Sequence, residues 1–425
     1  MNPITAVVIG AGGRGHVYAN YALSYPQDVK IVGVAEPNEQ RREVFRKEHN
    51  LPAENCFSSY EELLSRPKFA DAAFICTQDK MHVVPALKAM ELGYHLLLEK
   101  PISPSAKECF DLAEAAKKYD RHVLVCHVLR YTSLFKKIKA LLDSGAIGNV
   151  VSMLHCENVG NLHQAHSFVR GSWRNTEESS PMILAKCCHD MDLLYWLVGS
   201  RCTSVSSFGS LTYFKESNAP EGAPPRCLDG CPHSDTCPYY APRVYINGTY
   251  AWMCDAVCSS VCSDPTPEQV VEILKTSPYG RCVFHCDNDV VDHQVANLCF
   301  ENGATVTFSM CAFTARIDRT LKIMGTKGEL RAIMSDSLSG QDTIEIRDFE
   351  TESSTFYYPT ALGGGHGGGD TGIMRDFVRL LRGENTSTSL TDISVSAESH
   401  ALAFAAEASR LSGQTIDMDT WRASL

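Results

Sequence analysis

A glycine-rich loop follows directly on the first short apolar run of the chain. The loop fits the G-x-G-x-x-G spacing and consists of Gly10, Ala11, Gly12, Gly13, Arg14 and Gly15. Glycines in this pattern permit a tight turn and let backbone N–H groups approach a pyrophosphate. The helix expected behind them adds a favourable dipole for negative charge. The loop therefore predicts a dinucleotide-binding site, with a ligand-free glycine turn as the alternative.

An acidic residue stands where such a site needs a contact to the ribose. Glu36 lies about 20 residues beyond the loop, at the end of the second apolar run. A carboxylate there accepts hydrogen bonds from the ribose hydroxyls and repels a 2′-phosphate, which favours NAD over NADP. The nearby Arg41 and Arg42 keep NADP open.

A lysine follows a later apolar run, inside the sequence Glu99-Lys100-Pro101. In an open α/β sheet, ligands bind outside the carboxyl ends of the strands, which is where Lys100 would lie. Pro101 restricts Lys100 to extended geometry and so directs its side chain. A cation there could hold a substrate hydroxyl or carbonyl and assist proton transfer. The alternative is a solvated surface lysine.

Taken together, these motifs resemble the Gfo/Idh/MocA oxidoreductases, the relatives of glucose–fructose oxidoreductase and inositol dehydrogenase. The resemblance covers nearly the whole chain outside 216–280. It rests on the glycine loop, Thr77-Gln78, Glu99-Lys100-Pro101, Gly145-x-Ile147-Gly148 and the segment around His189. It implies an NAD-dependent oxidoreductase that transfers hydride at a carbinol carbon of a sugar, polyol or glycoside. It also implies a homo-oligomer, a dimer or tetramer, assembled through an open sheet.

The resemblance assigns His189 the role of the acid/base that exchanges a proton with the substrate hydroxyl. An ordinary histidine pKa near 6.5 suits that role near neutral pH. Family members carry an aspartate four residues earlier, whereas this chain has Ala185 there and Lys186 next. Lys186 is the candidate to take over part of the missing carboxylate's role. A buried structural histidine is the alternative.

Further candidates follow the later strands. The candidate cofactor contacts are Thr77, Gln78, His82, Glu99, Lys100 and Arg130. A polar-aromatic run before the His189 segment suits sugar binding, since tryptophan stacks on sugar rings and charged groups bond hydroxyls. It consists of His166, Arg170, Trp173 and Arg174, and an exposed loop is the alternative. Arg170, Arg174 and Lys186 together could hold an anionic substituent.

A second glycine-rich loop, at 363–369, contains His366. It resembles the His-Gly-Gly loop of NAD-dependent α-N-acetylgalactosaminidases in the same superfamily, and a flexible loop is the alternative. The resemblance raises a second function, an NAD-dependent glycosidase that oxidises C3 transiently, eliminates the aglycone, adds water and returns the hydride. That route needs additional acid/base groups, which His366 would supply. A non-catalytic NAD sensor is a third class, but it would need neither Lys100 nor His189.

Cysteines gather in a Pro-rich segment. Converging thiolates suit structural zinc, which takes four tetrahedral ligands. The candidate ligands are Cys227, Cys231, Cys237 and Cys286. Free thiols are the alternative, and the C-x2-C spacing common in iron–sulfur sites is absent from this set.

Alternating apolar runs and helical stretches over 1–130 predict a doubly wound parallel sheet, a Rossmann NAD-binding domain. After that, strand-like segments joined by short turns predict an α+β domain over 131–425 with a large, mostly antiparallel open sheet. Residues 216–280 are expected to be an irregular Cys-rich insertion. A helix near the C-terminus, with helical spacing of its apolar residues over 393–411, is expected to pack back on the first domain.

Composition bounds the remaining possibilities. The 425 residues carry a net charge of −11 with no basic stripe, which argues against nucleic-acid partners. No apolar run is long enough to cross a membrane, and the first residues lack the pattern of a signal peptide. A cytoplasmic enzyme acting on a sugar-like small molecule is expected.

Overall fold

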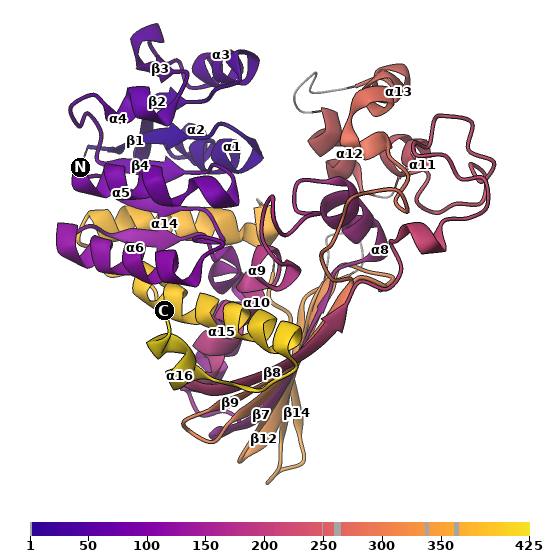
Figure 1. Ribbon diagram of the computed structural model, residues 1–425. Helices are drawn as coiled ribbons and strands as arrows, with labels where there is room; N and C mark the ends of the chain where they lie inside the picture. The colour runs from indigo at the N-terminus through magenta and orange to yellow at the C-terminus, as the bar shows by residue number, and fades with distance from the viewer. Residues whose placement is uncertain (1, 249, 259–264, 336–339, 361–364) are drawn as a thin grey trace.

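Two β-sheets organise the chain (Figure 1), and the computed structural model describes residues 2–248, 250–258, 265–335, 340–360 and 365–425. The first sheet is six-stranded and parallel, in the order β3-β2-β1-β4-β5-β6. Its strands are β1 (Ile4–Ile9), β2 (Val29–Ala35), β3 (Cys56–Phe57), β4 (Ala72–Ile75), β5 (His95–Leu98) and β6 (Val123–Val125). Their nearly continuous apolar sequences match burial on both faces.

Helices cover both faces of this sheet. They are α1 (Gly13–Ala19), α2 (Tyr21–Ser24), α3 (Glu39–Glu48), α4 (Tyr60–Leu64), α5 (Val83–Glu91) and α6 (Ala106–Tyr119). A helix from far along the chain, α14 (Gly369–Leu381), joins the face that α1 covers and buries Phe377 against Phe74 of β4. This places the segment just before α14 beside the glycine loop.

The second sheet has nine strands in the order β14-β13-β12-β11-β7-β10-β9-β8-β15, and only the β7–β10 pair is parallel. The strands are β7 (Val150–Asn158), β8 (Cys202–Ser210), β9 (His293–Phe300), β10 (Thr305–Cys311), β11 (Asp318–Gly325), β12 (Gly328–Met334), β13 (Thr343–Asp348), β14 (Ser354–Tyr357) and β15 (Ile416–Asp417). Their alternating burial marks a sheet with one core face. A parallel Rossmann sheet followed by a mostly antiparallel sheet is the fold class that the sequence predicts, and it is confirmed.

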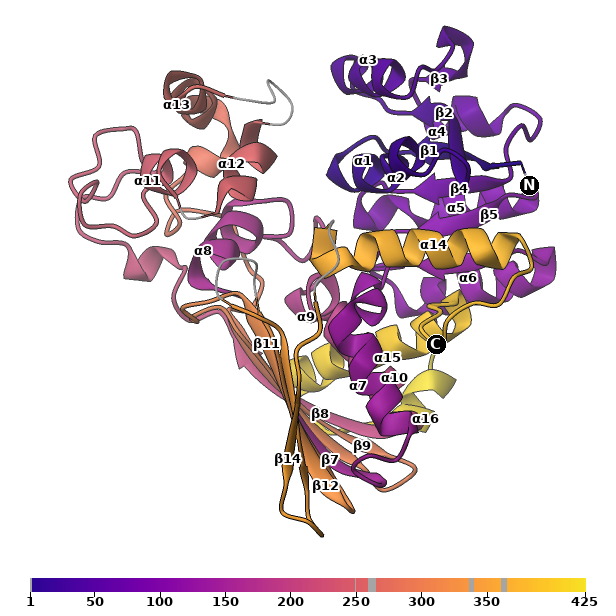
Figure 2. The same cartoon turned by 180° about the vertical axis from the view of Figure 1, so that it is seen from behind.

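Among the described residues, the core face of this sheet carries five helices. They are α7 (Ser133–Asp143), α9 (Met182–Ala185), α10 (Cys188–Val198), α15 (Ile393–Ser412) and α16 (Met418–Ala423). Of these, α15 also packs against α6 of the first domain. Helix α15 packs Ala397 into the core of the Rossmann domain and Leu402 into that of the second sheet. The opposite face of the sheet carries no helix among the described residues (Figure 2).

The segment between β8 and β9 stands across from the Rossmann domain (Figure 1). It is more regular than its composition predicts, with helices α11 (Ala241–Ile246), α12 (Ala251–Cys258) and α13 (Pro267–Thr276). Thr266 and Gln269 form a reciprocal capping box with proline at the first turn of α13, which explains why a helix begins there. A small apolar core of its own holds the three helices together.

Within the described part of the chain, no helix combines the length and the apolar character needed to cross a membrane.

Candidate active site between the two domains

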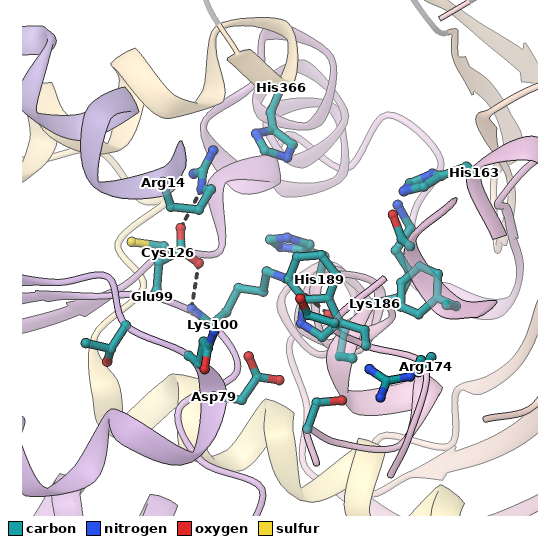
Figure 3. Close-up of a pocket in the computed structure, with 18 of the residues that line it drawn as sticks. Arg14, Asp79, Glu99, Lys100, Cys126, His163, Arg174, Lys186, His189 and His366 are labelled. Carbon is teal, nitrogen blue, oxygen red and sulfur yellow. Dashed lines mark hydrogen bonds and ion pairs between the residues drawn. The ribbon is translucent and has the colours of Figure 1, made fainter. Parts of the chain in front are cut away.

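A cavity of about 730 Å³ lies between the Rossmann strand ends, the His189 helix and the β8–β9 insertion (Figure 3). The strand ends bring Arg14, Thr77, Gln78, Glu99 and Lys100 to one wall. Because the carboxyl ends of parallel strands meet at one edge of the sheet, residues far apart in sequence gather there. Residues from the second domain and from the β8–β9 insertion form the opposite wall.

The glycine loop has the shape that a dinucleotide requires. Gly10 has a φ of +94°, and a Cβ atom on Gly15 would lie 2.1 Å from the Gly10 carbonyl oxygen, so neither position tolerates a side chain. At Gly12 and Gly13 a Cβ would meet nothing within 4 Å. Gly12 caps α1 with no side-chain hydrogen bond. The open loop and the uncapped helix N-terminus together fit a pyrophosphate.

Glu36 anchors this loop from the end of β2. Its carboxylate accepts hydrogen bonds from the backbone N–H of Ala11 at 2.9 Å and of Asn38 at 3.0 Å. The Arg42 guanidinium donates to the Glu36 carbonyl oxygen. Arg42 is thus engaged with the backbone, while the buried carboxylate stands beside the loop where a ribose would lie. This arrangement favours NAD.

Glu99 connects the glycine loop to the lysine. It accepts from Arg14 at 2.6 Å, from the Tyr18 hydroxyl at 2.8 Å and from the Lys100 backbone N–H at 2.9 Å (Figure 3). Burial alone would raise the pKa of Glu99, but the charges of Arg14 and Lys100 bring it below its ordinary value. The resulting carboxylate fixes the backbone at Lys100.

His82 braces two strand-end loops from behind the cavity wall. Its Nδ1 lies 2.8 Å from the Pro101 carbonyl oxygen and its Nε2 lies 3.1 Å from that of Thr77. The side chain is buried, and it is not among the residues that line the cavity. Thr77 and Gln78 do line it.

Lys100 and His189 face the same cavity from opposite domains (Figure 3). The Lys100 ammonium donates to the Ala185 carbonyl oxygen at 3.1 Å and lies 5.8 Å from the Trp173 ring. Among the described residues no carboxylate forms an ion pair with it. Burial, followed by the charge of Lys100, lowers the pKa of His189 well below its ordinary value. The imidazole is therefore neutral at neutral pH, and it is a weaker base than the histidine of ordinary pKa that the sequence analysis expects.

A buried charge cluster lies beneath the His189 helix. Lys186 pairs with Glu157 at 3.3 Å, Arg319 pairs with Glu157 at 2.7 Å, and Arg319 also pairs with Asp190 at 2.8 Å. Burial raises the pKa of Glu157, whereas the Arg319 charge overcomes the opposing effect of burial and lowers that of Asp190. The carboxylate that pairs with Lys186 thus comes from β7, whereas Asp190, inside the His189 helix, pairs with Arg319.

The other predicted substrate residues divide into two groups. Trp173 and Arg174 line the cavity, and Arg174 pairs with Asp287 and Glu178. Arg170 instead bonds the carbonyl oxygens of Arg281 and Tyr239, and so holds the insertion in place.

Two other residues that were predicted to contact a ligand bind other parts of the protein instead. The His166 ring stacks on Tyr279 at 4.8 Å between centroids and bonds the Tyr245 hydroxyl, outside the cavity lining. Arg130 is also not a lining residue, because its guanidinium makes a buried bidentate pair with Asp192 at 2.6 Å.

His366 reaches the cavity from the segment before α14, while residues 363–364 of its loop lie outside the described residues. Its ring centroid is 6.1 Å from that of His189. Its Nδ1 lies 3.0 Å from Asp370, which also binds Arg14 at 2.6 Å. The second glycine-rich loop is thereby connected to the first.

The predicted zinc site finds no support. Within the described ranges, no group of three or more His, Cys, Asp or Glu side chains is placed to hold a metal ion. Cys227 instead accepts a contact from Arg170 at 3.5 Å, and the Cys286 thiol donates to the Cys282 carbonyl oxygen. Cys231 and Cys237 lie around the same small hollow as Cys227 without forming a ligand cluster. Close spacing in sequence did not make four thiols converge on one point.

Several lining residues escaped sequence analysis, namely His163, Phe168, Trp252 and Arg319, together with Glu157 beneath them. Glu157 and Arg319 carried a usable signal, since each occupies an inward position of an alternating strand. Charges at such positions are rarely buried without a partner. Trp252 carried no such signal, because its place depends on how the insertion folds.

Comparison with known proteins agrees with this architecture. A family profile described as "Oxidoreductase family, NAD-binding Rossmann fold" matches residues 4–127, and its companion "Oxidoreductase family, C-terminal alpha/beta domain" matches 139–418. The chain belongs to the Gfo/Idh/MocA oxidoreductase family. Its first domain is accordingly the NAD-binding domain of that family.

Individual relatives are distant. The putative oxidoreductase YteT of Bacillus subtilis is 25% identical over 76% of this chain and 78% of its own length. An inositol 2-dehydrogenase of Corynebacterium glutamicum is 24% identical over 47% of this chain and 55% of its own. This chain thus spans about half of some relatives. The fold also matches an oxidoreductase from Agrobacterium radiobacter solved with NAD+, L-tartaric acid and magnesium, with a TM-score of 0.69, 15% identity and coverage of 99% and 100% of the two chains.

Proposed function

We propose that this family member oxidises or reduces a carbinol carbon of a sugar, polyol or glycoside with NAD. The observation that carries the proposal is the convergence of two groups on one cavity beside the glycine loop. They are the Lys100 ammonium, which has no carboxylate partner among the described residues, and the neutral His189 imidazole. The inositol dehydrogenase relative supports a polyol or sugar as the substrate class.

The residues present fit the cofactor. The N–H groups at Gly12 and Gly13 would hold the pyrophosphate and Glu36 the adenosine ribose, while Thr77 and Gln78 line the route into the cavity. When bound, NAD supplies the acceptor or donor of hydride.

Side chains of the protein itself bind the reacting oxygen and transfer its hydroxyl proton. Lys100 holds the reacting oxygen and favours the negative charge that develops there as the carbinol proton leaves. His189, neutral because it is buried, accepts that proton, and in the reverse direction it donates one. Lys186, held by Glu157, is placed to bond a neighbouring hydroxyl and so to orient the sugar.

A substrate panel tests this assignment. Purified protein is incubated with NAD and with free sugars, polyols and glycosides, while NADH absorbance and product masses are followed together. Net NADH with a product lighter by two hydrogens supports the dehydrogenase. Failure of every member to produce NADH or any other product contradicts it and favours the sensor class.

One observation favours the glycosidase as a second candidate. His366 brings another imidazole into the cavity, close to His189 and backed by Asp370. Transient oxidation with elimination requires more acid/base groups than a simple dehydrogenase does. Aglycone release without net NADH, lost in His366→Ala, is the result expected of this route.

We also propose that the chain assembles as a homo-oligomer through the face of the second sheet that carries no helix (Figure 2). That face leaves Leu154, Phe208 and Val295 exposed. Light scattering of the wild type and of Phe208→Asp tests this assembly: the wild type should be oligomeric and the variant should dissociate. A monomeric wild type contradicts the assembly.

The cytoplasmic location stays a prediction.

A further inference from the structure

Among its described residues, the β8–β9 insertion contributes one side chain to the lining of the cavity, Trp252 of α12. Met253, Val257 and Cys258 bury the other side of this short helix in the core of the insertion. Trp252 is left 41% exposed. A large aromatic ring held in this way at a cavity wall, by a helix fixed from behind, is a platform for a ligand.

A line of rings connects this platform to the reaction centre. The Trp252 ring lies 5.1 Å from that of His163, His163 lies 6.0 Å from Phe168, and Phe168 lies 6.2 Å from Trp173. Trp173 in turn stands 5.8 Å from the Lys100 ammonium. Figure 3 shows His163 on the wall opposite Arg14 and Glu99. Trp252 is thus connected to Lys100 through the rings of His163, Phe168 and Trp173.

The rings of this line carry no charge at neutral pH. Burial lowers the pKa of His163 well below its ordinary value and that of the supporting His166 to about 4, so both imidazoles are uncharged at neutral pH. The nearby Arg174 is already paired with Asp287 and Glu178. Lys100, which has no carboxylate partner among the described residues, stands at the Trp173 end of this line of rings, whereas the Trp252 end offers aromatic surface to an uncharged ring.

We propose that Trp252 forms a distal subsite for an uncharged second ring, so that the substrate is a glycoside carrying a sugar or aryl group rather than a free monosaccharide. The proposal rests on the proposed function, because it takes the reacting sugar to lie at Lys100 and His189. In this arrangement the reacting ring lies between Lys100 and His189, and its aglycone extends along Phe168 and His163 to stack on Trp252. The insertion then selects the substrate without taking part in the chemistry.

The test measures binding and turnover separately. Protein saturated with NAD is titrated calorimetrically with matched sets of D-glucose, D-galactose and their N-acetylamino analogues. Each sugar is supplied free, as its p-nitrophenyl glycoside and as its 1-phosphate. NADH absorbance and p-nitrophenol release are recorded in parallel. The variants are Trp252→Ala, Trp252→Phe and, as a matched control at a tryptophan outside the cavity lining, Trp421→Phe.

At least one aryl glycoside is expected to bind about tenfold more tightly than its free sugar, which corresponds to roughly 1.4 kcal/mol of stacking. Trp252→Ala should remove that advantage and leave the affinity for the free sugar within about twofold, since the reacting ring is held elsewhere. Trp252→Phe should keep most of the advantage, and Trp421→Phe should match the wild type.

Three results would overturn the subsite: no aryl glycoside binds more tightly than its free sugar, Trp252→Ala weakens both equally, or the 1-phosphates bind best. A Trp252-dependent advantage without any turnover would remove the proposed function and leave the subsite standing. If sugars are turned over at the same rate whether or not Trp252 is replaced, the proposed function stands and the subsite is removed.

Discussion

The two walls of the cavity are built on different physical principles. The Rossmann wall is made of charges held in fixed pairs, with Glu99 binding Arg14 and the Lys100 backbone at one strand end. The opposite wall combines aromatic rings and histidines that burial keeps neutral, such as His163, with the ion pairs of Lys186 and Arg319 beneath them. The first arrangement suits a charged ligand, the dinucleotide, and the second also offers surface to an uncharged ring. The contrast teaches that the cofactor side of the site depends on ion pairs at strand ends, whereas the substrate side depends on rings and charges gathered from several distant elements.

The largest expected effect comes from the cation at the boundary of the two walls. Lys100→Met keeps the length of the side chain but removes the charge that holds the reacting oxygen, so kcat should fall by about 10² to 10⁴. Affinity for NAD, measured by fluorescence titration, should change by less than about threefold, since the glycine loop and Glu36 are untouched. Lys107→Met on the exposed surface of α6 is the matched control. An equal loss of NAD affinity would show that Lys100 serves the cofactor wall alone.

The charge cluster under the substrate wall should be the next most sensitive. Glu157→Gln leaves the buried charges of Lys186 and Arg319 with one carboxylate fewer, and the free energy of unfolding should fall by about 3 kcal/mol. Urea denaturation measures the loss, with Glu345→Gln on the surface of β13 as the control. If stability is unchanged, the cluster does not depend on the Glu157 charge, and the sugar-orienting role given to Lys186 loses its support.

On the cofactor side of the cavity, the corresponding substitution is Glu36→Ala. Removing this carboxylate frees the Ala11 N–H and deletes the ribose contact, so NAD should bind about 2 kcal/mol more weakly. Affinity for NADP should fall less or rise, because the repulsion of a 2′-phosphate disappears. Titration of both cofactors measures the ratio. A preference for NAD that survives the substitution would place the discrimination elsewhere.

The smallest effect of a single substitution is expected at the neutral histidines, and it concerns the dependence of the unfolding free energy on pH. Burial lowers the pKa of His127, His163 and His189 well below 6.5, so the unfolded chain binds more protons than the folded one below that pH. Stability is therefore complete above pH ~6.5 and is lost as the pH falls below it, by about 1.4 kcal/mol per unit for each such group.

His127→Leu should reduce the dependence of the unfolding free energy on pH by the contribution of one histidine. Both nitrogens of His127 are buried, and among the described residues neither has a hydrogen-bond partner. Denaturation at a series of pH values measures it. His122→Leu, at a position in the loop before β6, is the control. An unchanged slope would mean that His127 titrates in the folded protein much as it does in the unfolded one.

The cofactor half of the site could be predicted from local sequence. Gly10, Gly15 and Glu36 act through a turn and a strand end, whose geometry neighbouring residues decide, and the structure places them accordingly. The parallel and antiparallel sheets were likewise predictable, since hydrophobic periodicity reports burial on one or two faces. Lys100 could be named from its place at a strand end, whereas His189 was named through the family resemblance.

The substrate half was decided by tertiary structure. Arg130 and Arg170 were predicted ligands, yet each found a buried partner, Asp192 and the Tyr239 carbonyl, that no local pattern indicates. Arg14 meets Asp370 across 356 positions of sequence, and Trp252 reaches the cavity through the folding of a separate small core. The geometry of a turn or a strand end depends on residues that are neighbours in the sequence. The partner of a buried charge and the wall of a cavity depend instead on which distant elements pack together.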